Sequence, residues 1–534
     1  MFESAGLQGS ISKCVDTEMP TAPSAQTPRA VTRLARPSRR WSKDGASHRA
    51  SPGHTAGPPS PPPGSLGSAP NPTLCEAMPV AAEPTSTTPT DPPAARAATE
   101  NAGHTDPGRP PRVVIVGAGF GGITLARELA EAPVEVVLVD RRNHHLFQPL
   151  IYQVATASLE PADVAYPVRG LLAKASNATF RLAEVTGVDW EARRLLTDDG
   201  PAIAFDHLVV AAGAETATFG IEGIEEHAFG LKSLSDGLRL RDHLLREVER
   251  AEGRQESIDE QGSLTVTICG AGPTGVELAG ATSELFGHVL ARDFPELDFG
   301  RARIVLAEMA EQVLPGASRQ QQEYVAEQLR DRGVELRLGQ AITEVGDREV
   351  VLEDGTRIRS GTIVWTAGVQ ANPLAGALGL EQGPGGRIVV DDGLAVPDHP
   401  NVWAVGDIAA RGDDPEPQLA PVAIQGAKHV AEEIRRAVVG EPSRPFRYRD
   451  KGTMTTIGRR AAVAELPLGI TLRGTPGWLA WLLLHLVTLT GGRTRVSVLT
   501  NWLSSYVRWQ KPGRLIIGTD EDHAGLRAEP EPPE

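Results

Sequence analysis

Cysteine is scarce in this sequence, with only 3 among 534 residues. Cys14, Cys75 and Cys269 lie too far apart to form a CxxC redox pair, a disulfide framework or a zinc site, and we expect no metal. Positive charge is also in deficit, because 53 Lys and Arg stand against 68 Asp and Glu and leave a formal net charge of −15. A protein that binds nucleic acid needs a basic surface to contact phosphates, so this balance argues against DNA or RNA as a partner.

The first 111 residues lack a periodic apolar pattern and hold 20 of the 43 prolines. They contain too few large apolar side chains to offset the entropy of ordering, so we predict that residues 1–111 form a disordered tail. This tail also lacks the apolar stretch of about 7–15 residues that a secretory signal requires, and export is not expected. Its basic, serine-rich part, residues 29–49, weakly resembles a transit peptide, and an incorrectly assigned start codon upstream of Met78 is an alternative.

A glycine fingerprint opens the part of the chain that we expect to be ordered. Val113–Val116 is a short β-branched run typical of a buried parallel strand, and Gly117, Gly119 and Gly122 follow it into a helical pattern. In such a fingerprint the first glycine permits a tight turn, the second lets the backbone approach a pyrophosphate, and the third lets helix and strand pack closely. A second β-branched run ends at Asp140, where a carboxylate can bind ribose hydroxyls.

The same fingerprint occurs a second time. Gly270, Gly272 and Gly275 follow the predicted strand Leu264–Cys269, and a later strand ends at Glu308. A carboxylate at that position accepts hydrogen bonds from the 2′-hydroxyl of NADH and repels the 2′-phosphate of NADPH. Two such units predict two bound dinucleotides, and the chemical pairing they suggest is a flavin beside a nicotinamide.

Three further strand patterns are followed by a glycine. Phe205–Ala214 and Gly361–Val369 are apolar runs that end with a small residue and a glycine, as in the returning strands of flavoproteins related to the disulfide reductases. In the third, the strand Val402–Val405 is followed by a glycine and Asp407. We expect a helix from Ile408 onward, which would place Asp407 where it can bond a ribityl hydroxyl of a flavin.

Together these motifs resemble the type II (non-proton-pumping) NADH dehydrogenases over residues 111–517. Many flavoproteins share the glycine fingerprints. The stretches HHLFQPLIYQVATASL at 144–159 and APVAIQGAKHVAEEI at 420–434 are much more specific to this family. The resemblance implies an α/β fold with two Rossmann-like dinucleotide-binding domains of the glutathione-reductase type. It also implies an enzyme that binds FAD and NADH and transfers electrons from NADH to a membrane quinone without pumping protons.

The resemblance also implies the candidate site residues. Those expected at FAD are Gly117, Gly119, Phe120, Gly122, Asp140, Val185, Gly213, Gly406, Asp407 and Ala423. Those expected at NADH are Gly270, Gly272, Thr274, Gly275, Glu308 and Gly368. The expected catalytic residues are Glu277, which would position the nicotinamide or relay protons to the quinone, and Gln425, which belongs to the quinone-site motif.

The quinone-site motif departs from the family at one position. The family pattern is Ala-Gln-x-Ala-x-Gln, and residues 420–425 of this chain read Ala-Pro-Val-Ala-Ile-Gln. Pro421 has neither a side-chain amide nor a backbone N–H. This departure concerns the details of quinone binding and not the flavin chemistry.

The scarcity of cysteine distinguishes the chain from relatives of similar fold. Enzymes that resemble thioredoxin reductase, lipoamide dehydrogenase or sulfide:quinone reductase pass electrons through cysteines near the flavin. Here Cys14 and Cys75 lie in the predicted tail and Cys269 in a predicted buried strand. We therefore expect direct transfer from flavin to quinone. The alternatives are NAD(P)H-dependent reduction of a soluble acceptor (ferredoxin, rubredoxin or dye-like) and a nucleotide-sensing protein without turnover.

Acidic residues are absent between residues 466 and 519, where six Lys and Arg occur. Pro476–Thr490 is apolar, but as a helix its unbroken core would span about 20 Å, less than the roughly 30 Å hydrocarbon core of a bilayer. Val496–Trp509 predicts an amphipathic helix. Its expected apolar face consists of Leu499, Trp502, Leu503, Tyr506 and Trp509, and its expected polar face largely of Ser497, Thr500, Asn501, Ser504, Ser505 and Arg508.

These features predict that residues 476–509 bind a lipid surface. Trp478, Trp481, Trp502 and Trp509 would lie at headgroup depth, and the basic side chains would meet anionic lipid. The expected location is peripheral (monotopic), on the cytoplasmic face of the cell membrane. An apolar interface in a homodimer is the alternative, and both can hold.

The patterns divide the chain into five predicted parts. They are a disordered tail (1–111), an FAD-binding domain (112–230 and 366–440), an NADH-binding domain (231–365), a membrane-anchoring or dimer region (441–519) and an acidic tail (520–534).

Overall fold

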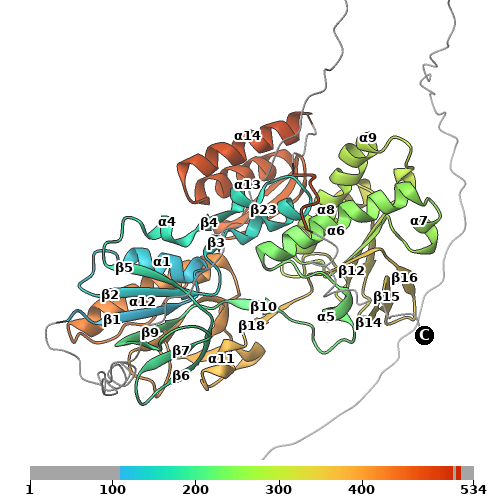
Figure 1. Cartoon of the computed structure of the whole chain (residues 1–534). Helices are drawn as coiled ribbons and strands as arrows, with labels where there is room; N and C mark the ends of the chain where they lie inside the picture. Colours follow the sequence, from blue (N-terminus) through green and yellow to red (C-terminus); the bar gives the residue numbers. More distant parts are fainter. Residues whose placement is uncertain (1–108, 509–512, 519–534) are drawn as a thin grey trace, which may run out of the picture. The chain divides into compact units, whose positions relative to one another are not determined.

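The computed structural model describes residues 109–508 and 513–518 (Figure 1). Nearly all of the predicted N-terminal tail and the whole acidic tail therefore lie outside the described residues, as does Trp509. The described part contains both helices and strands, and several strands follow one another without an intervening helix. The strands form two separate parallel sheets, each following one of the two glycine fingerprints.

The first sheet has five parallel strands in the order β20-β9-β1-β2-β5. Their bounds are β1 Arg112–Val116, β2 Glu135–Asp140, β5 Ala178–Leu182, β9 His207–Val210 and β20 Val402–Ala404. All four residues of β9 are buried, as expected for a strand covered on both faces. Helix α1 (Phe120–Glu128) packs against helix α12 (Ala420–Val438), which comes from the end of the chain that also supplies β20.

The second sheet has four parallel strands in the order β13-β12-β11-β17. Their bounds are β11 Thr265–Cys269, β12 Arg303–Glu308, β13 Val334–Leu338 and β17 Thr362–Trp365. Helix α8 (Pro273–Glu284) follows the second fingerprint and continues as a π-helical segment, Leu285–Leu290. The main helices nearby are α6 (Leu234–Gly253) and α10 (Arg319–Asp331).

Smaller elements complete these two units. Strand β10 (Ala214–Thr216), after the first sheet, pairs antiparallel with β18 (Val369–Ala371), after the second. Three further small sheets are β3 (His144–Leu146) with β4 (Ala165–Pro167), β6 (Val185–Asp189) with β7 (Arg194–Thr197) and β8 (Ile203–Ala204), and β14 (Ile342–Gly346) with β15 (Glu349–Leu352) and β16 (Arg357–Arg359).

One expected element is wrong. No helix begins at Ile408. Gly406–Ile408 forms a single 3-10 turn, and strand β21 (Ala409–Arg411) follows it. Strand β21 pairs in parallel with β19 (Ile388–Val390), a segment about twenty residues earlier. These backbone partners make the extended conformation favourable, and the helix that we expected begins only at Ala420, as α12.

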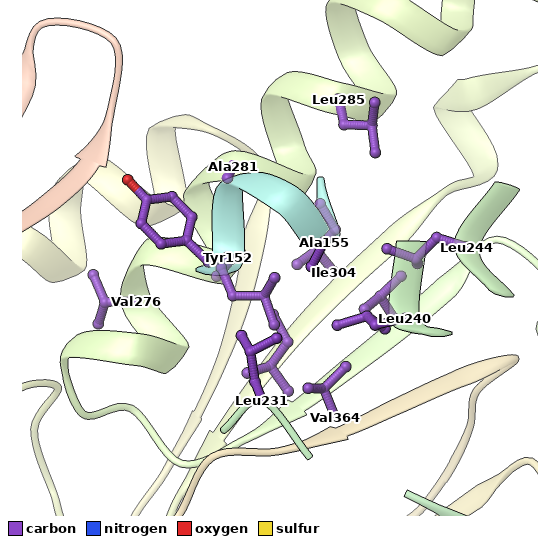
Figure 2. Close-up of a cluster of buried hydrophobic side chains, with 14 of the residues drawn as sticks. Tyr152, Ala155, Leu231, Leu240, Leu244, Val276, Ala281, Leu285, Ile304 and Val364 are labelled. Carbon is purple, nitrogen blue, oxygen red and sulfur yellow. The ribbon is translucent and has the colours of Figure 1, made fainter. Parts of the chain in front are cut away.

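The stretch at 144–159 forms helix α2 (Ile151–Ala155) inside a buried cluster (Figure 2). Tyr152 and Ala155 pack there with Leu240 and Leu244 of α6 and with residues of α8. The stretch therefore contacts helix α6, which precedes the second fingerprint, and helix α8, which follows it.

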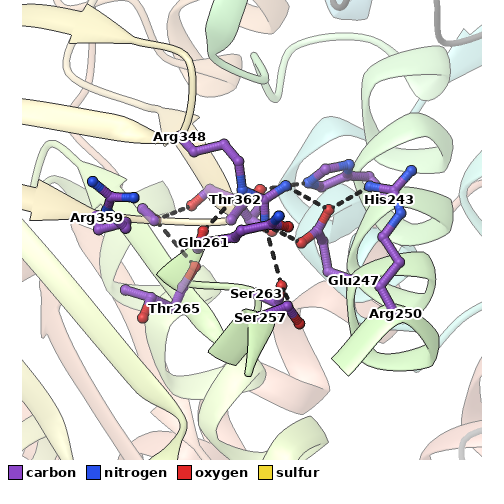
Figure 3. Close-up of polar contacts among 12 residues, drawn as sticks. His243, Glu247, Arg250, Ser257, Gln261, Ser263, Thr265, Arg348, Arg359 and Thr362 are labelled. Atoms are coloured by element: carbon purple, nitrogen blue, oxygen red, sulfur yellow. Dashed lines mark hydrogen bonds and ion pairs between the residues drawn. The ribbon is translucent and has the colours of Figure 1, made fainter. Parts of the chain in front are cut away.

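A polar cluster fastens α6 to the β14–β15 turn (Figure 3). The Glu247 carboxylate, 1% exposed, forms ion pairs with Arg348 and, at 2.7 Å, with Arg250. Burial by itself would raise the pKa of Glu247, but the hydrogen bond and charge of Arg348 outweigh it and hold the pKa below its ordinary value. His243 Nε2 lies 2.9 Å from the Gly361 carbonyl oxygen. The cluster is structural and lies away from both fingerprints.

The C-terminal region consists of a small sheet and a helical hairpin. Strands β22 (Thr453–Gly458), β23 (Ala461–Leu466) and β24 (Ile470–Arg473) are antiparallel and lead into α13 (Gly474–Thr488) and α14 (Gly492–Arg508). Strand β22 packs directly on α8, where a Cβ at Gly280 would stand 1.9 Å from the Ile457 carbonyl oxygen. This close approach places the C-terminal sheet against the helix that carries Glu277.

Candidate active site

The first fingerprint forms a cradle of backbone at the start of α1. Gly117 has φ +106°, and a Cβ on Gly122 would stand 1.7 Å from the Gly117 carbonyl oxygen, so both positions require glycine. A Cβ on Gly119 would meet no atom within 4 Å. Gly119 is the N-cap of α1, so open space lies at a helix N-terminus, where backbone N–H groups and the helix dipole favour phosphate. This geometry suits the pyrophosphate of FAD.

Asp140 is held at the carboxyl end of β2. Its carboxylate accepts hydrogen bonds from the backbone N–H groups of Ala118, at 2.6 Å, and Arg142, at 2.7 Å. The Ala183 N–H donates to the Asp140 carbonyl at 3.1 Å, which brings the turn before Val185 beside this carboxylate. Each carboxylate oxygen keeps a lone pair for a ribose hydroxyl.

Phe120, in the first fingerprint, contacts the stretch 144–159 that is specific to the family. Its ring makes edge contacts with His145, at 5.2 Å between centroids, and with Phe147, at 5.8 Å. His145 Nδ1 donates to the carbonyl oxygen of Ala118, within the first fingerprint, at 2.9 Å. The motif therefore braces the cradle from one side.

Gly406, Asp407 and Ala423 are also brought together at this edge of the sheet. Gly406 has φ +78°, and a Cβ there would stand 3.0 Å from the Ala423 Cβ, so α12 approaches the turn closely. The Asp407 carboxylate lies 3.6 Å from Lys232 Nζ. Lys232 was not among the predicted residues, because it comes from the segment before α6 and nothing in its local sequence points to Asp407.

Gly213 follows β9, and Gly406 follows β20. Both strands belong to the five-stranded parallel sheet, so the residues expected at FAD gather at the carboxyl ends of neighbouring strands. Ligands of open α/β sheets bind at that edge. The tertiary structure thus assembles the expected set from segments up to about 300 residues apart.

The second fingerprint repeats the first in detail. Gly270 also has φ +106°, and a Cβ on Gly275 would stand 1.9 Å from the Gly270 carbonyl oxygen. A Cβ on Gly272, the N-cap of α8, would again meet nothing within 4 Å. Thr274 is half-buried in the first turn of that helix. The geometry suits a second dinucleotide pyrophosphate.

Glu308 occupies the place that Asp140 holds in the first unit. Its carboxylate accepts from the backbone N–H groups of Ala271, at 2.6 Å, and Ala310, at 3.0 Å. The two arginines near it in sequence are paired elsewhere: Arg301 with Asp259, and Arg303 with Glu335 at 2.8 Å. Their positive charges are thus directed to other carboxylates, which favours a 2′-hydroxyl over a 2′-phosphate at Glu308.

Gly368, expected at NADH, follows β17 at the same edge of the second sheet. A Cβ there would stand 2.5 Å from the Phe219 ring, so a larger residue would require that exposed side chain to move. Thr366 Oγ1, which was not predicted, donates to the carbonyl oxygens of Cys269, at 3.0 Å, and Gly270, at 2.9 Å. It ties β17 to the first glycine of the fingerprint.

Glu277 lies on α8 and is buried among residues of three other elements. Burial raises its pKa to about 8, against the opposing effects of the Thr456 N–H and the Trp481 indole. The Thr456 N–H lies 3.3 Å from Glu277 Oε1. At neutral pH this side chain is therefore a neutral carboxylic acid. The sequence did not reveal Thr456 or Trp481 as its neighbours, because both come from the C-terminal region.

A buried chain of hydrogen bonds runs from α14 to the neighbourhood of Glu277. Trp502 Nε1 donates to Gln153 Oε1 at 2.8 Å, and Gln153 Nε2 donates to the Tyr152 hydroxyl at 2.8 Å. Burial raises the pKa of Tyr152 well above its ordinary value, and the Glu277 charge adds to this. Tyr152 therefore stays protonated beside Glu277.

The side-chain amide of Gln425 forms hydrogen bonds with the backbone of Arg449. Its Nε2 donates to the Arg449 carbonyl at 2.9 Å, and its Oε1 accepts from the Arg449 N–H at 3.1 Å. Each end of the amide keeps one further hydrogen-bonding position, so the role of Gln425 at a quinone stays a prediction. Pro421 lies in the first turn of α12, where a missing backbone N–H costs nothing.

Cys269 is the only cysteine among the described residues, and it is fully buried at the end of β11. Burial raises the pKa of its thiol to about 12. A thiol with that pKa is a poor nucleophile and has no cysteine neighbour in this part of the chain, so no thiol pair stands between a flavin and its electron acceptor there.

The expected orientation of the C-terminal helices is partly wrong. Trp481 and Trp502 are 0% and 3% exposed and pack in the core, so they do not lie at headgroup depth. The expected polar face of α14 docks on the protein as well: Ser497 and Asn501 donate to Asp163 at 2.6 and 2.7 Å, and Ser505 is buried. The long apolar side chains left exposed are Leu479, Leu483, Leu484, Val487, Val496, Leu499 and Leu503.

Among residues 109–508 and 513–518, no helix is both long and apolar enough to cross a bilayer.

Comparisons with known proteins agree with this geometry. Residues 111–427 match the family described as pyridine nucleotide-disulphide oxidoreductase. The type II NADH:quinone oxidoreductase Ndh of Mycobacterium tuberculosis is 38% identical over 79% of this chain and 94% of its own length. The type II NADH:quinone oxidoreductase of Staphylococcus aureus is 31% identical over 66% of this chain and 89% of its own.

Solved structures share the fold. NDH2 of Plasmodium falciparum, in complex with NADH, has a TM-score of 0.71 at 18% identity and covers 77% of this chain and 100% of its own. The sulfide:quinone oxidoreductase of Aquifex aeolicus has a TM-score of 0.56 at 17% identity, over 78% of this chain and 94% of its own. The predicted fold class with two Rossmann-like domains is confirmed, as are FAD and NADH as cofactors. The chain belongs to the type II NADH:quinone oxidoreductases, within the pyridine nucleotide-disulphide oxidoreductase family.

Proposed function

We propose that this chain oxidises NADH and reduces a membrane quinone through bound FAD, without pumping protons. The observation that carries the proposal is the repeated cradle. Each of two parallel sheets places an open glycine at a helix N-terminus and a carboxylate at the end of the next strand. Two dinucleotides are thereby accommodated in one chain, and the described part offers no thiol pair as an intermediate carrier.

FAD, when bound, supplies a flavin that accepts a hydride from NADH and returns two electrons to an acceptor. The chain's own residues hold and orient these groups. The backbone around Gly119 and Gly272 faces the two pyrophosphates, and Asp140 and Glu308 accept from ribose hydroxyls. Lys232 holds the Asp407 carboxylate in place for the ribityl chain.

We assign Glu277 the role of a proton donor on the path to the quinone. Its carboxyl group is neutral at pH 7 because burial raises its pKa to about 8. A buried acid with a pKa near the working pH can give up its proton and regain it readily. Gln425, by its contacts with Arg449, positions the segment that follows α12 rather than taking part in proton transfer.

The central experiment uses the purified full chain with FAD. The protein should be yellow, should bleach when NADH is added without oxygen, and should regain its colour when a quinone follows. A preparation that stays free of flavin after reconstitution would contradict the proposal. Recovery with a ferredoxin, a rubredoxin or a dye but not with a quinone would favour the alternative of a soluble acceptor.

We further propose that residues 476–509 bind a lipid surface and make the protein peripheral on the cytoplasmic face of the cell membrane. Support comes from the exposed apolar side chains of the α13–α14 hairpin, such as Leu483 at 64% and Leu503 at 63%. The surrounding stretch, residues 466–519, carries six Lys and Arg and no acid. A quinone resides in the bilayer, so an enzyme that reduces it benefits from docking there.

The double variant Leu483→Asp, Leu503→Asp tests this docking. Both side chains are mostly exposed, so the fold should persist, while lipid vesicles should be bound at least about tenfold more weakly because each leucine contributes roughly 1.5–3 kcal/mol on burial. Vesicle sedimentation measures the binding, and reduction of a water-soluble dye should stay unchanged. The matched control replaces Leu182 and Leu196, exposed leucines of the FAD-binding half, with Asp. Equal losses in both variants would refute docking through the hairpin.

A homodimer is likewise proposed, on the resemblance to the family alone. Analytical ultracentrifugation of the detergent-solubilised protein distinguishes it from a monomer.

A further inference from the structure

An open apolar groove lies along the α13–α14 hairpin. It has a volume of about 450 Å³ and is lined by five residues of α13, between Trp478 and Leu486, and four of α14, between Leu499 and Tyr506. These residues follow helical spacing, so each helix contributes one face to the groove. Its volume falls within the range of about 300–1,000 Å³ that is typical of sites for small molecules.

The described part of the chain leaves this groove partly uncovered. Leu479, Leu483, Leu499 and Leu503, which line it, are 55%, 64%, 51% and 63% exposed. Exposed apolar side chains gathered in a groove indicate an apolar ligand or partner. The occupant must therefore present a hydrocarbon surface at least as long as the row of leucines.

Two arginines, Arg459 and Arg460, complete the lining of the groove. They form the turn between β22 and β23, and both also line a second, polar cavity of about 620 Å³, whose other charged or titratable residues are Glu284, His288, Asp331 and Arg332. The arginines thus stand where an apolar groove meets a polar cavity. Arg332 adds a third guanidinium, so the cavity holds three guanidinium groups against the two carboxylates of Glu284 and Asp331, and the Glu284 carboxylate accepts from the Arg459 backbone N–H.

We propose that the groove binds one acyl chain of an anionic phospholipid, with the lipid phosphate at Arg459 and Arg460. The inference rests on the proposed membrane association, and it specifies a class of lipid and a binding site for it. An acyl chain matches the apolar walls, and a phosphate matches guanidinium groups at the boundary with the polar cavity. Because the whole lipid combines both parts, it satisfies the groove and the arginines together.

A second copy of this chain matches the same surface poorly. Residues 466–518 include basic side chains and no acid, so a two-fold contact of this face with itself would oppose like charges. An anionic lipid has the complementary charge.

The test uses the FAD-loaded full chain and soluble, monomeric lipids, so it needs no membrane. Dihexanoyl phosphatidylglycerol and dihexanoyl phosphatidylcholine are titrated separately below their micelle concentrations. Tryptophan fluorescence reports binding, because Trp478 and Trp502 line the groove. The anionic lipid should bind about twenty-fivefold more tightly, since each of the two arginines contributes on the order of a fivefold gain.

The Arg460→Gln variant should reduce the ratio of the affinities for the anionic and the zwitterionic lipid. The double variant Arg459→Gln, Arg460→Gln should reduce this ratio to about one. Arg460 is exposed, so its replacement leaves the fold intact. The control is Arg473→Gln, Arg493→Gln, which removes the same charge from the neighbouring basic stretch 466–519 and away from the groove lining. It should keep the preference.

Three results would overturn the proposal. Equal affinity for the two lipids, or equal losses in the arginine variants and the control, would show that the arginines do not select a lipid of net negative charge. Displacement of the bound lipid by a short-chain quinone would assign the groove to the substrate. Absence of monomer binding in a protein that still sediments with vesicles would reject the lipid-binding site while leaving the proposed membrane association standing.

Discussion

A Gly119→Val variant is expected to fold normally and to be purified without flavin. Gly119 has extended backbone angles, φ −72° and ψ −164°, that valine adopts, and nothing lies within 4 Å of a Cβ placed there. The added methyl groups enter the space that the FAD pyrophosphate needs. Overpacking of this kind costs roughly 1–3 kcal/mol or more, so affinity should fall at least about fivefold. Flavin absorbance per chain and NADH oxidation measure the loss.

The same substitution at Gly272 separates the two cradles. Gly272→Val should leave the protein yellow, because the first cradle is untouched, and should raise the KM for NADH at least about fivefold for the same steric reason. Gly170→Val, in the short helix α4 (Val168–Leu172), is the matched control, since it too has nothing within 4 Å of its Cβ. Stoichiometric flavin in Gly119→Val, or flavin loss in Gly170→Val, would contradict the assignment of the first cradle.

Replacement of Glu277 by Gln is expected to slow quinone reduction about a hundredfold, the lower end of what general acid–base catalysis contributes. Gln keeps the shape of the neutral acid and can still accept from the Thr456 N–H, but it cannot release a proton. Reduction of the flavin by NADH should remain close to the wild-type rate. Stopped-flow measurement of the two half-reactions separates these effects.

The pH dependence supplies an independent readout. The folded wild type keeps the Glu277 proton up to pH about 8, whereas the unfolded chain loses it near the ordinary value of 4.5. The free energy of unfolding should therefore fall as pH rises from about 4.5 to 8, and Glu277→Gln should lack this contribution. The melting temperature of the variant should rise relative to the wild type across that range. A variant with the wild-type pH profile and quinone rate would remove Glu277 from the mechanism.

The two cradles could be predicted from sequence because their requirements are local. Gly117 and Gly270 need a positive φ, and Gly122 and Gly275 need close contact within five residues, so residue identity and spacing suffice. Asp140 and Glu308 follow at the ends of the next strands, and both are held by a backbone N–H of the fingerprint itself. The fold class follows from the same repeated pattern.

Contacts between distant segments escaped prediction. Nothing near Gln425 indicates that its amide would be used by Arg449, and nothing near Lys232 points to Asp407. The segment after Asp407 depends likewise on β19, which pairs with strand β21 where a helix from Ile408 was expected. Backbone pairing with a remote segment outweighs a weak local preference.

By itself, the sequence determined the two nucleotide cradles, the acids beside them and the shortage of cysteine that leaves no local thiol pair for electron relay. Only the tertiary structure decided the environment of Glu277 and the orientation of the tryptophans. A raised pKa requires burial, and α8 is buried by β22 and Trp481 from about 200 residues further along the chain. Trp481 and Trp502 bury their rings in the core because α2 and α8 offer apolar partners there, and this leaves leucines, not tryptophans, on the exposed face of the hairpin.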